Sequence, residues 1–273
     1  AVDALWYFTG YRIKEDKPLA NVVVNTDFVK SRALSEFVAV EKLSITTNHK
    51  LNSETIGYRE YQTLNDFLTR ANSNMEKAKE NLSEKRYYSA MSNIFNAKIQ
   101  LNYISDSIDV MANKDSTIVK NKIEAAQKEL DEANQLITNE SANIRGITSF
   151  ECLAASEKRA IEAENLISDA WKNFYNQKYY DAIYYANFAQ ERAKTAKLWM
   201  DVSKENSKGE TIIDESQIKY NASQRIEDAR LSLVYAQTLI GQNTLLTQSA
   251  ELLTAAENEY EKGKYAAAIF DAI

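Results

Sequence analysis

The stretch Asn176-Gln-Lys-Tyr-Tyr180-Asp-Ala182 decides the fold, because two similar stretches occur elsewhere in the chain. They are Glu84-Lys-Arg-Tyr-Tyr88-Ser-Ala90 and Glu261-Lys-Gly-Lys-Tyr265-Ala-Ala267. Each stretch joins two segments with helical spacing of apolar residues and keeps an aromatic residue two positions before an alanine. A bulky ring that plugs a turn, followed by a small residue that lets the next helix approach, is typical of a helical hairpin. The sequence therefore predicts a repeated antiparallel hairpin.

The composition agrees with an all-α fold. The 273 residues include one proline and six glycines, and both residue types interrupt helices. The chain has 44% hydrophobic and 26% charged residues, which is ordinary for a globular domain. We expect antiparallel helical hairpins and bundles, preceded by a short irregular N-terminal segment.

The spacing of apolar residues predicts three helices per repeating unit. From Tyr58 onward, apolar residues recur at alternating steps of three and four, which places them on one face of a helix. The tyrosines of the three turns, Tyr88, Tyr180 and Tyr265, lie 92 and 85 residues apart. This distance fits a hairpin plus one long connecting helix. The connecting helices are expected to begin at Asp115 or Ser116 and at Asp214, which are good N-cap residues.

The same patterns suggest a division into three segments. Residues 1–52 are expected to hold the end of a preceding domain, a linker and one helix, which starts at Thr26 or Asp27 and ends before Thr46. Residues 53–145 form the first hairpin with its connecting helix, and residues 146–273 form the second and third hairpins. The chain starts without methionine and stops at Ile273 soon after the third turn, so we expect it to be a piece of a longer protein.

The sequence offers no catalytic, metal-binding or cofactor-binding residue. His49 and Cys152 are the only residues of their types, and we expect a solvated loop histidine and a buried cysteine. The apolar helix seams are expected to carry no acids, which argues against a metal-carboxylate bundle. Gly-rich phosphate loops, nucleophile elbows and the H-E-x-x-H motif do not occur.

The charge and hydropathy of the chain limit the classes of partner that we expect it to bind. The net charge is -6 and no block of Lys or Arg occurs, so nucleic acid is not an expected partner. No apolar run reaches the length of about 18 residues that a membrane span needs. Protein or peptide partners remain, together with self-association through alanine-rich seams. For Tyr88, Tyr180 and Tyr265 we favour turn packing, and an exposed binding hot spot is the alternative.

The opening Ala1-Val-Asp-Ala-Leu5-Trp-Tyr-Phe-Thr-Gly10-Tyr11-Arg-Ile13 resembles the closing helix of the protease domain in archaeal Lon-like (S16-type) serine peptidases. In that family a long helical C-terminal region follows, and the remaining 260 residues are similar to it in character. The resemblance implies a membrane-associated or exported parent with a Ser-Lys dyad upstream of Ala1. No serine or lysine here matches the catalytic motif. The chain is therefore expected to be a non-catalytic domain for assembly, substrate access or partner docking.

The turns also resemble the helix A to helix B junction of tetratricopeptide repeats. The likeness is clearest in Tyr175-Asn-Gln-Lys-Tyr-Tyr180-Asp-Ala182-Ile183 and in Tyr260-Glu-Lys-Gly-Lys-Tyr265-Ala-Ala-Ala268-Ile269. The spacing departs from the period of about 34 residues of that family, so we interpret the likeness as local hairpin packing. A free-standing tetratricopeptide-like adaptor is the alternative function, and an enzyme with an unrecognised site is a weaker one.

Overall fold

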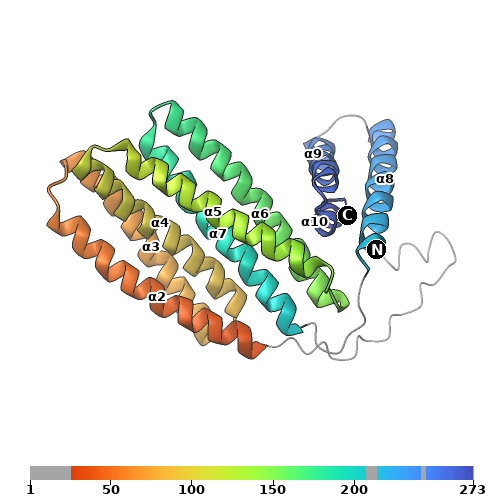
Figure 1. Cartoon of the computed structure of the whole chain (residues 1–273), viewed down its shortest axis with the longest axis horizontal. Coiled ribbons are helices and arrows are strands. Elements are labelled where there is room, and N and C mark those ends of the chain that lie inside the picture. Colours follow the sequence, from red (N-terminus) through yellow and green to blue (C-terminus); the bar gives the residue numbers. More distant parts are fainter. Residues whose placement is uncertain (1–25, 207–213, 241–243, 273) are drawn as a thin grey trace.

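The computed structural model describes residues 26–206, 214–240 and 244–272, which form helices and no strand. Figure 1 shows long helices lying side by side, which confirms the all-α prediction. The expected irregular N-terminal segment and residues 1–13 lie outside the described residues. In chain order the helices are α2 (Thr26–Ser53), α3 (Tyr58–Ser83), α4 (Tyr87–Asn113), α5 (Ser116–Ser141), α6 (Gly146–Tyr175), α7 (Tyr179–Asn206), α8 (Glu215–Ile240), α9 (Thr244–Glu261) and α10 (Tyr265–Asp271).

The helices pack in groups of three. In each group the first helix contacts both helices of the hairpin that follows: α2 contacts α3 and α4, α5 contacts α6 and α7, and α8 contacts α9 and α10. Each group therefore contains three helices, and the connecting helix packs mainly on the hairpin that follows it. Helices α4 and α7 join the first two groups, and α10 joins the third group to α6. The predicted boundaries near residues 52 and 145 stay a prediction, and one buried cluster runs across both.

The three hairpin turns share one hydrogen-bonded structure. One residue in each turn has a positive φ, of 61° at Lys85, 60° at Gln177 and 75° at Gly263. The next backbone N–H then donates to the carbonyl oxygen five residues earlier, over 2.8 to 2.9 Å. A left-handed residue followed by such a bond is the Schellman motif, which satisfies carbonyl groups at a helix end.

These bonds also fix which residues of the three turns are equivalent. The donors of the five-residue bond are Arg86, Lys178 and Lys264. A tyrosine follows each donor, so the equivalent tyrosines are Tyr87, Tyr179 and Tyr265. Tyr265 therefore matches Tyr179, and the match to Tyr180 that we took from the sequence is wrong by one residue. The sequence alignment failed because two tyrosines stand together in the first two turns and only one in the third.

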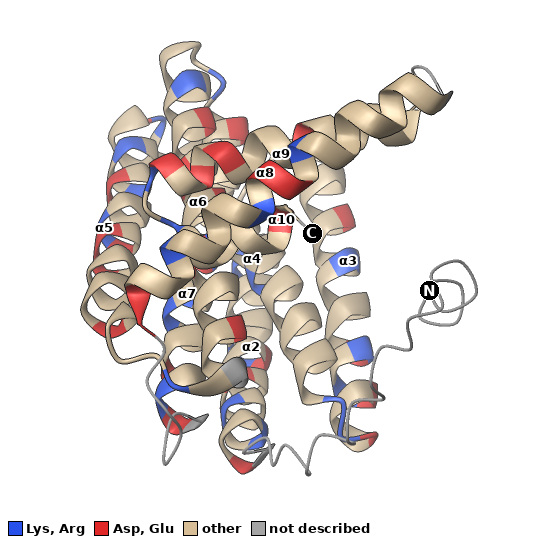
Figure 2. Ribbon diagram, turned by 90° about the vertical axis from the view of Figure 1, so that its right-hand side faces the viewer, with Lys and Arg blue, Asp and Glu red and all other residues tan. Residues whose placement is uncertain are grey.

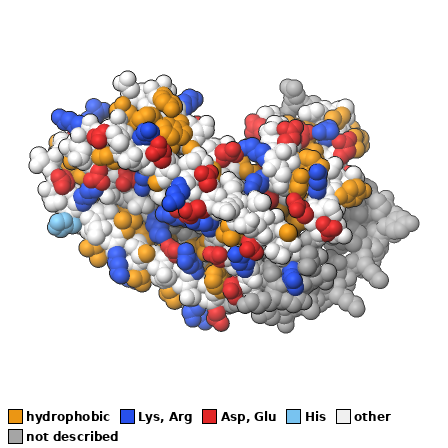
Figure 3. Space-filling model, viewed as in Figure 1, with side chains coloured by type: hydrophobic (Ala, Val, Ile, Leu, Met, Phe, Trp, Pro, Cys, Tyr) orange, Lys and Arg blue, Asp and Glu red, His pale blue; other side chains and the backbone are white. Residues whose placement is uncertain are grey.

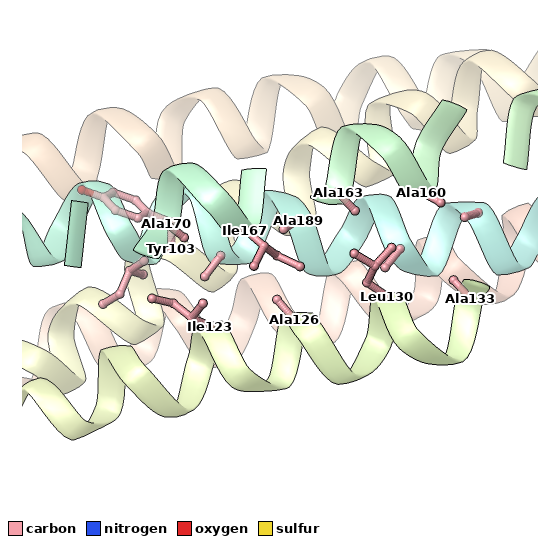
Figure 4. Packing of buried hydrophobic residues seen from close by; sticks show 14 of the residues in the cluster. Tyr103, Ile123, Ala126, Leu130, Ala133, Ala160, Ala163, Ile167, Ala170 and Ala189 are labelled. Atoms are coloured by element: carbon pink, nitrogen blue, oxygen red, sulfur yellow. The ribbon is translucent and has the colours of Figure 1, made fainter. Parts of the chain in front are cut away.

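Alanine seams let α7 lie close to α5 and α6 (Figure 4). Five fully buried alanines of α7 share this face: Ala182, Ala186, Ala189, Ala193 and Ala196. The facing seams mix alanine with larger residues, and they include Ile123, Ala126, Leu130 and Ala133 of α5 and Ala160, Ala163, Ile167 and Ala170 of α6. The Ser156 hydroxyl of α6 donates to the Ala196 carbonyl oxygen over 2.8 Å. Small seam residues of this kind allow close approach and dense packing.

Helix α2 is longer than the sequence predicted. We expected it to end before Thr46, but it continues to Ser53. Leu51 is buried against the core, and the Lys50 ammonium donates to the Ser105 carbonyl oxygen of α4 over 2.9 Å. These tertiary contacts outweigh the weak helix propensity of the threonine pair. His49 consequently lies on a helix, not in the predicted loop.

The third group differs from the other two in the length of its last helix. Helix α10 has 7 residues, whereas α4 has 27 and α7 has 28. Figure 2 shows α8 and α9 projecting beyond the other helices, and among the described residues no third helix accompanies their far half. None of the described helices combines the length and hydropathy that a membrane-spanning helix needs.

Candidate functional site

A groove of about 550 Å³ runs along α4 and α7. Helices α4 and α7 pack together beneath it, and α2 and α5 contribute residues at its two sides. Figure 3 shows this part of the surface, where Lys and Arg side chains gather around a hollow. Apolar residues from four helices line it, namely Val29, Met91, Ile94, Leu136, Leu198 and Val202. We call this feature the α4–α7 groove.

An aromatic pair lies at one end of the α4–α7 groove. The rings of Tyr88 and Trp199 are parallel within 7° and their centroids are 5.5 Å apart. Tyr88 is 46% exposed and Trp199 is partly exposed. Burial raises the pKa of Tyr88, so its hydroxyl stays protonated and available as a hydrogen-bond donor. The pair offers a flat apolar surface with a polar tip.

Charged side chains link the helices around the groove. The Lys98 ammonium of α4 donates to the Glu36 carboxylate of α2. The Lys197 ammonium of α7 pairs with two carboxylates of α5, those of Glu129 and Glu132, the second at 2.9 Å. Burial alone would lower the pKa of Lys197, but the two carboxylates raise it on balance. Lys98 and Lys197 are therefore held in place on opposite sides of the groove.

Arg192 forms the central cationic group of the α4–α7 groove. Its guanidinium lies over the rings of Phe95 and Phe188, at 4.6 and 5.1 Å from their centroids. The Nε atom lies 2.8 Å from a carboxylate oxygen of Glu162, which also accepts from Arg159. Burial, and then the charge of Arg159, lower the pKa of Arg192. A stacked, partly desolvated arginine of this type binds carboxylates well, because its planar fork is already oriented.

The structure does not bring the three predicted turn tyrosines together. Tyr88 lies in the groove, on Trp199 near the end of α7. Tyr180 lies in the first turn of α7, about 28 Å of helix from Trp199 at ~1.5 Å per residue. Tyr265 is partly buried and its ring contacts that of Tyr260 edge-on at 5.2 Å. Of the three, Tyr88 is the one placed at a candidate binding site.

The single histidine and the single cysteine do not line the α4–α7 groove. His49 is exposed, and Figure 3 shows it at an edge of this face, away from the hollow. Cys152 is buried beside Val29 and Val202, and burial raises the pKa of its thiol to about 12. The expectation of a buried cysteine is confirmed, and its thiol is protonated at neutral pH.

The prediction that the helix seams carry no acids is wrong. Glu157, Glu191 and Glu259 are all buried. The Glu157 carboxylate accepts from the Ala267 N–H of α10 over 3.0 Å, and burial raises its pKa to about 7. Burial, and then the Asp271 carboxylate, raise the pKa of Glu259 to about 7. Glu157 and Glu259 were missed because the groups beside them, the Ala267 N–H and the Asp271 carboxylate, belong to α10, which the apolar spacing within α6 and α9 does not reveal.

The α4–α7 groove suits non-covalent binding. Neither histidine nor cysteine lines it, and among the described residues no group of three His, Cys, Asp or Glu side chains is arranged to hold a metal. Sequence reasoning named Tyr88 but missed Arg192 and Trp199, because the groove combines helices far apart in the chain. The sequence signal that could have revealed the groove is the series of aromatic and basic residues on α7 beside its alanine seam, namely Phe188, Arg192 and Trp199. No family model, curated protein or solved structure matches the chain.

Proposed function

We propose that the chain is a non-catalytic helical scaffold that binds a protein segment in the α4–α7 groove. The observation that carries the proposal is a groove with an apolar floor that holds the partly exposed Tyr88–Trp199 stack at one end and Arg192 about two helical turns away along α7. Tyrosine, tryptophan and arginine are the residues that most often dominate protein-protein binding energy. A partly apolar groove with a few oriented charges is also the usual form of a binding site.

The charge of the groove indicates the chemistry of its ligand. The chain has a net charge of -6, yet basic residues outnumber acidic ones in the groove lining. The basic residues are Arg32, Lys98, Arg159, Arg192, Lys194 and Lys197, and the acidic residues are Glu36, Glu129, Glu191 and Asp201. A segment with an apolar anchor and flanking carboxylates complements this surface, since opposite potentials favour association. The groove therefore fits an acidic, amphipathic peptide segment.

The parent of this scaffold stays a prediction. The proposed link to Lon-like serine peptidases rests on residues 1–13, which lie outside the described residues, and a free-standing adaptor is the alternative. The groove serves partner docking in either setting. Finding an encoded Ser-Lys pair upstream of Ala1, with serine-dependent peptidase activity, is the result that favours the peptidase; a different upstream domain favours the adaptor.

A matched pair of substitutions on α4 tests the binding proposal. Ser92 is exposed and lines the groove, whereas Ser89 is exposed on the same helix outside it. Peptides selected from a random phage-displayed library are expected to be rich in apolar and acidic residues. Ser92→Trp should weaken their binding roughly tenfold or more, a loss of about 1.4 kcal/mol, while Ser89→Trp should leave it unchanged. Equal binding by both variants, or no enrichment of peptides, would contradict the proposal.

A further inference from the structure

The third helical group contacts the first two through a limited interface. Helix α10 packs on α6, and among the described residues this is the main contact between the third group and the others (Figure 1). Two buried apolar residues of the third group, Ile218 and Ala266, join the large buried cluster, and Tyr265 and Ile269 pack partly buried against it. The apolar part of the interface is therefore small, and its polar groups contribute strongly to how the two parts associate. We call this contact the α6–α10 interface.

Three carboxyl groups lie close together in the α6–α10 interface. Glu157 of α6 and Glu259 of α9 are only 4% and 5% exposed, and the Asp271 carboxylate of α10 pairs with the Lys158 ammonium of α6. The carboxyl groups of Glu259 and Asp271 are hydrogen-bonded to each other. Such a bond requires a proton on one of them, because an ionised carboxylate can only accept. The Oε2 atom of Glu259 is buried and has no hydrogen-bond partner among the described residues.

A polar cavity of about 190 Å³ lies beside Glu157 in this interface. The other polar residues that line it are Thr138 and Ser141 of α5, Glu215 of α8, and Lys262, Lys264 and Tyr265 at the α9–α10 turn. Lys262 pairs with Glu164 of α6 over 2.5 Å, whereas the charge of Lys264 acts on Glu157. A polar cavity of this size has room for water, so Glu157 can exchange protons with solvent while the helices stay folded.

The acids of the α6–α10 interface outnumber its cations. The acids are Glu157, Glu215, Glu259 and Asp271, and the cations that act on them are Lys158 and Lys264. Like charges that are buried together oppose ionisation, and a buried charge without a partner is costly. The interface is therefore most stable when some of its carboxyl groups are protonated, and ionisation of all of them favours separation of α10 from α6.

We propose that the third helical group docks on α6 under the control of protons, so that it is docked while Glu157 and Glu259 are protonated and separates as they ionise. Burial raises the pKa of Glu157 to about 7, and burial with the Asp271 carboxylate raises that of Glu259 to about 7. On separation both groups regain water and return toward 4.5. Docking is therefore strongest below pH 4.5, weakens up to about tenfold per pH unit for each proton, and loses this contribution as the pH rises through about 7.

Energy transfer between dyes on the full chain tests the proposal. One dye is attached to Ser168→Cys on α6 and the other to Thr254→Cys on α9, since both positions are exposed and belong to different groups. Cys152 does not compete for the dyes, because it is buried and its thiol pKa is about 12. Transfer is expected to fall between pH 5 and pH 8, as the ratio of separated to docked chains rises tenfold or more.

Substitution of the two acids should abolish this response. Glu157→Gln combined with Glu259→Gln cannot ionise at these positions, so transfer should stay high at pH 8. Glu259→Gln alone should leave the shallower response of one proton. The matched control combines Glu80→Gln with Glu251→Gln, which are exposed and should leave the wild-type response unchanged. Circular dichroism establishes that each variant is folded before its transfer is compared.

A second dye pair separates undocking from unfolding. Dyes on Ala125→Cys of α5 and Ser168→Cys of α6 report on the second helical group alone, and their transfer should stay constant from pH 5 to pH 8. A parallel fall in this pair would identify unfolding of the bundle and overturn the proposal. Constant transfer between Ser168→Cys and Thr254→Cys would overturn it too, as would a fall that persists when both acids are replaced by glutamine.

Discussion

At the scale of single residues, each hairpin turn has one residue with a positive φ, and this residue lets the cost of backbone strain be measured apart from side-chain contacts. Lys85 and Gln177 hold a positive φ that the third turn gives to Gly263. A residue with a side chain costs about 1–2 kcal/mol more than glycine in this left-handed region. Glycine at this position loses part of that advantage, because it has more conformational freedom in the unfolded chain. The first two turns thus carry a strain that the third avoids.

Substitutions at this position should change stability in opposite directions. We expect Gln177→Gly to raise the free energy of unfolding by roughly 0.5–1 kcal/mol, and Gly263→Ala to lower it by about 1 kcal/mol. A Cβ at Gly263 would meet no atom within 4 Å, so the loss reports the backbone alone. Urea denaturation provides the measurement. The control Asn176→Gly, at a φ of -83°, should destabilise, and a gain there would refute the explanation.

The buried Glu157 carboxyl predicts a pH dependence of stability. Its pKa is raised from 4.5 to about 7 when folded, so the folded chain retains a proton that the unfolded chain loses. Its contribution is complete below pH 4.5 and is lost as the pH rises through about 7. Lys264 and Glu215 face this group. Its neighbour Glu259 is in turn surrounded by Asp271 and Lys158.

Glu157→Gln tests this dependence directly, because glutamine keeps an oxygen that accepts from the Ala267 N–H and does not ionise. The variant should match the wild type near pH 4 and be more stable than it at pH 8. Denaturation curves across this range measure the effect, with the exposed Glu80→Gln as the control. A wild-type stability that rises between pH 5 and pH 8 relative to the variant would contradict the assignment.

At the scale of helices, packing at the alanine seams decides how closely the helices approach. Ala126 of α5 is fully buried against its neighbours, whereas the adjacent Ala125 is exposed. Ala126→Leu should lower the free energy of unfolding by about 1–3 kcal/mol, the usual cost of overpacking a core. Ala125→Leu should change it by less than about 0.5 kcal/mol. Thermal and urea unfolding compare the two, and similar effects would show that the seam tolerates larger residues.

The limits of sequence reasoning are also clearest for helices. Periodicity placed α3 from Tyr58 and α5 after Asp115, whose carboxylate indeed accepts from the Thr117 N–H. The same reasoning stopped α2 too early, because Leu51 and Lys50 extend it through contacts with other helices. Local pattern fixes a helix when its own apolar stripe is continuous. It fails where partners distant in the sequence supply the stabilisation.

At the scale of the whole molecule, packing between the helical groups creates the candidate binding surface. The first two groups form one continuous core, and the α4–α7 groove runs along the helices that join them. The sequence revealed the three hairpins through their turns, but it did not reveal the groove, since Tyr88, Arg192 and Trp199 meet only after the groups pack. The periodic spacing of apolar residues predicts a helix and its buried face. It does not predict which charged and aromatic residues of two different helices will lie together.

Hydrogen-deuterium exchange of the full chain, with and without a peptide selected for binding, tests the central claim most directly. Our account predicts slower exchange over residues 88–98 of α4 and 191–202 of α7 when the peptide binds, because these segments line the groove. It also predicts unchanged exchange in α9, and the Ser92→Trp variant should lose the effect. Protection confined to α8 and α9, or no change in α4 and α7 at saturating peptide, would contradict the assignment of the groove as the binding site.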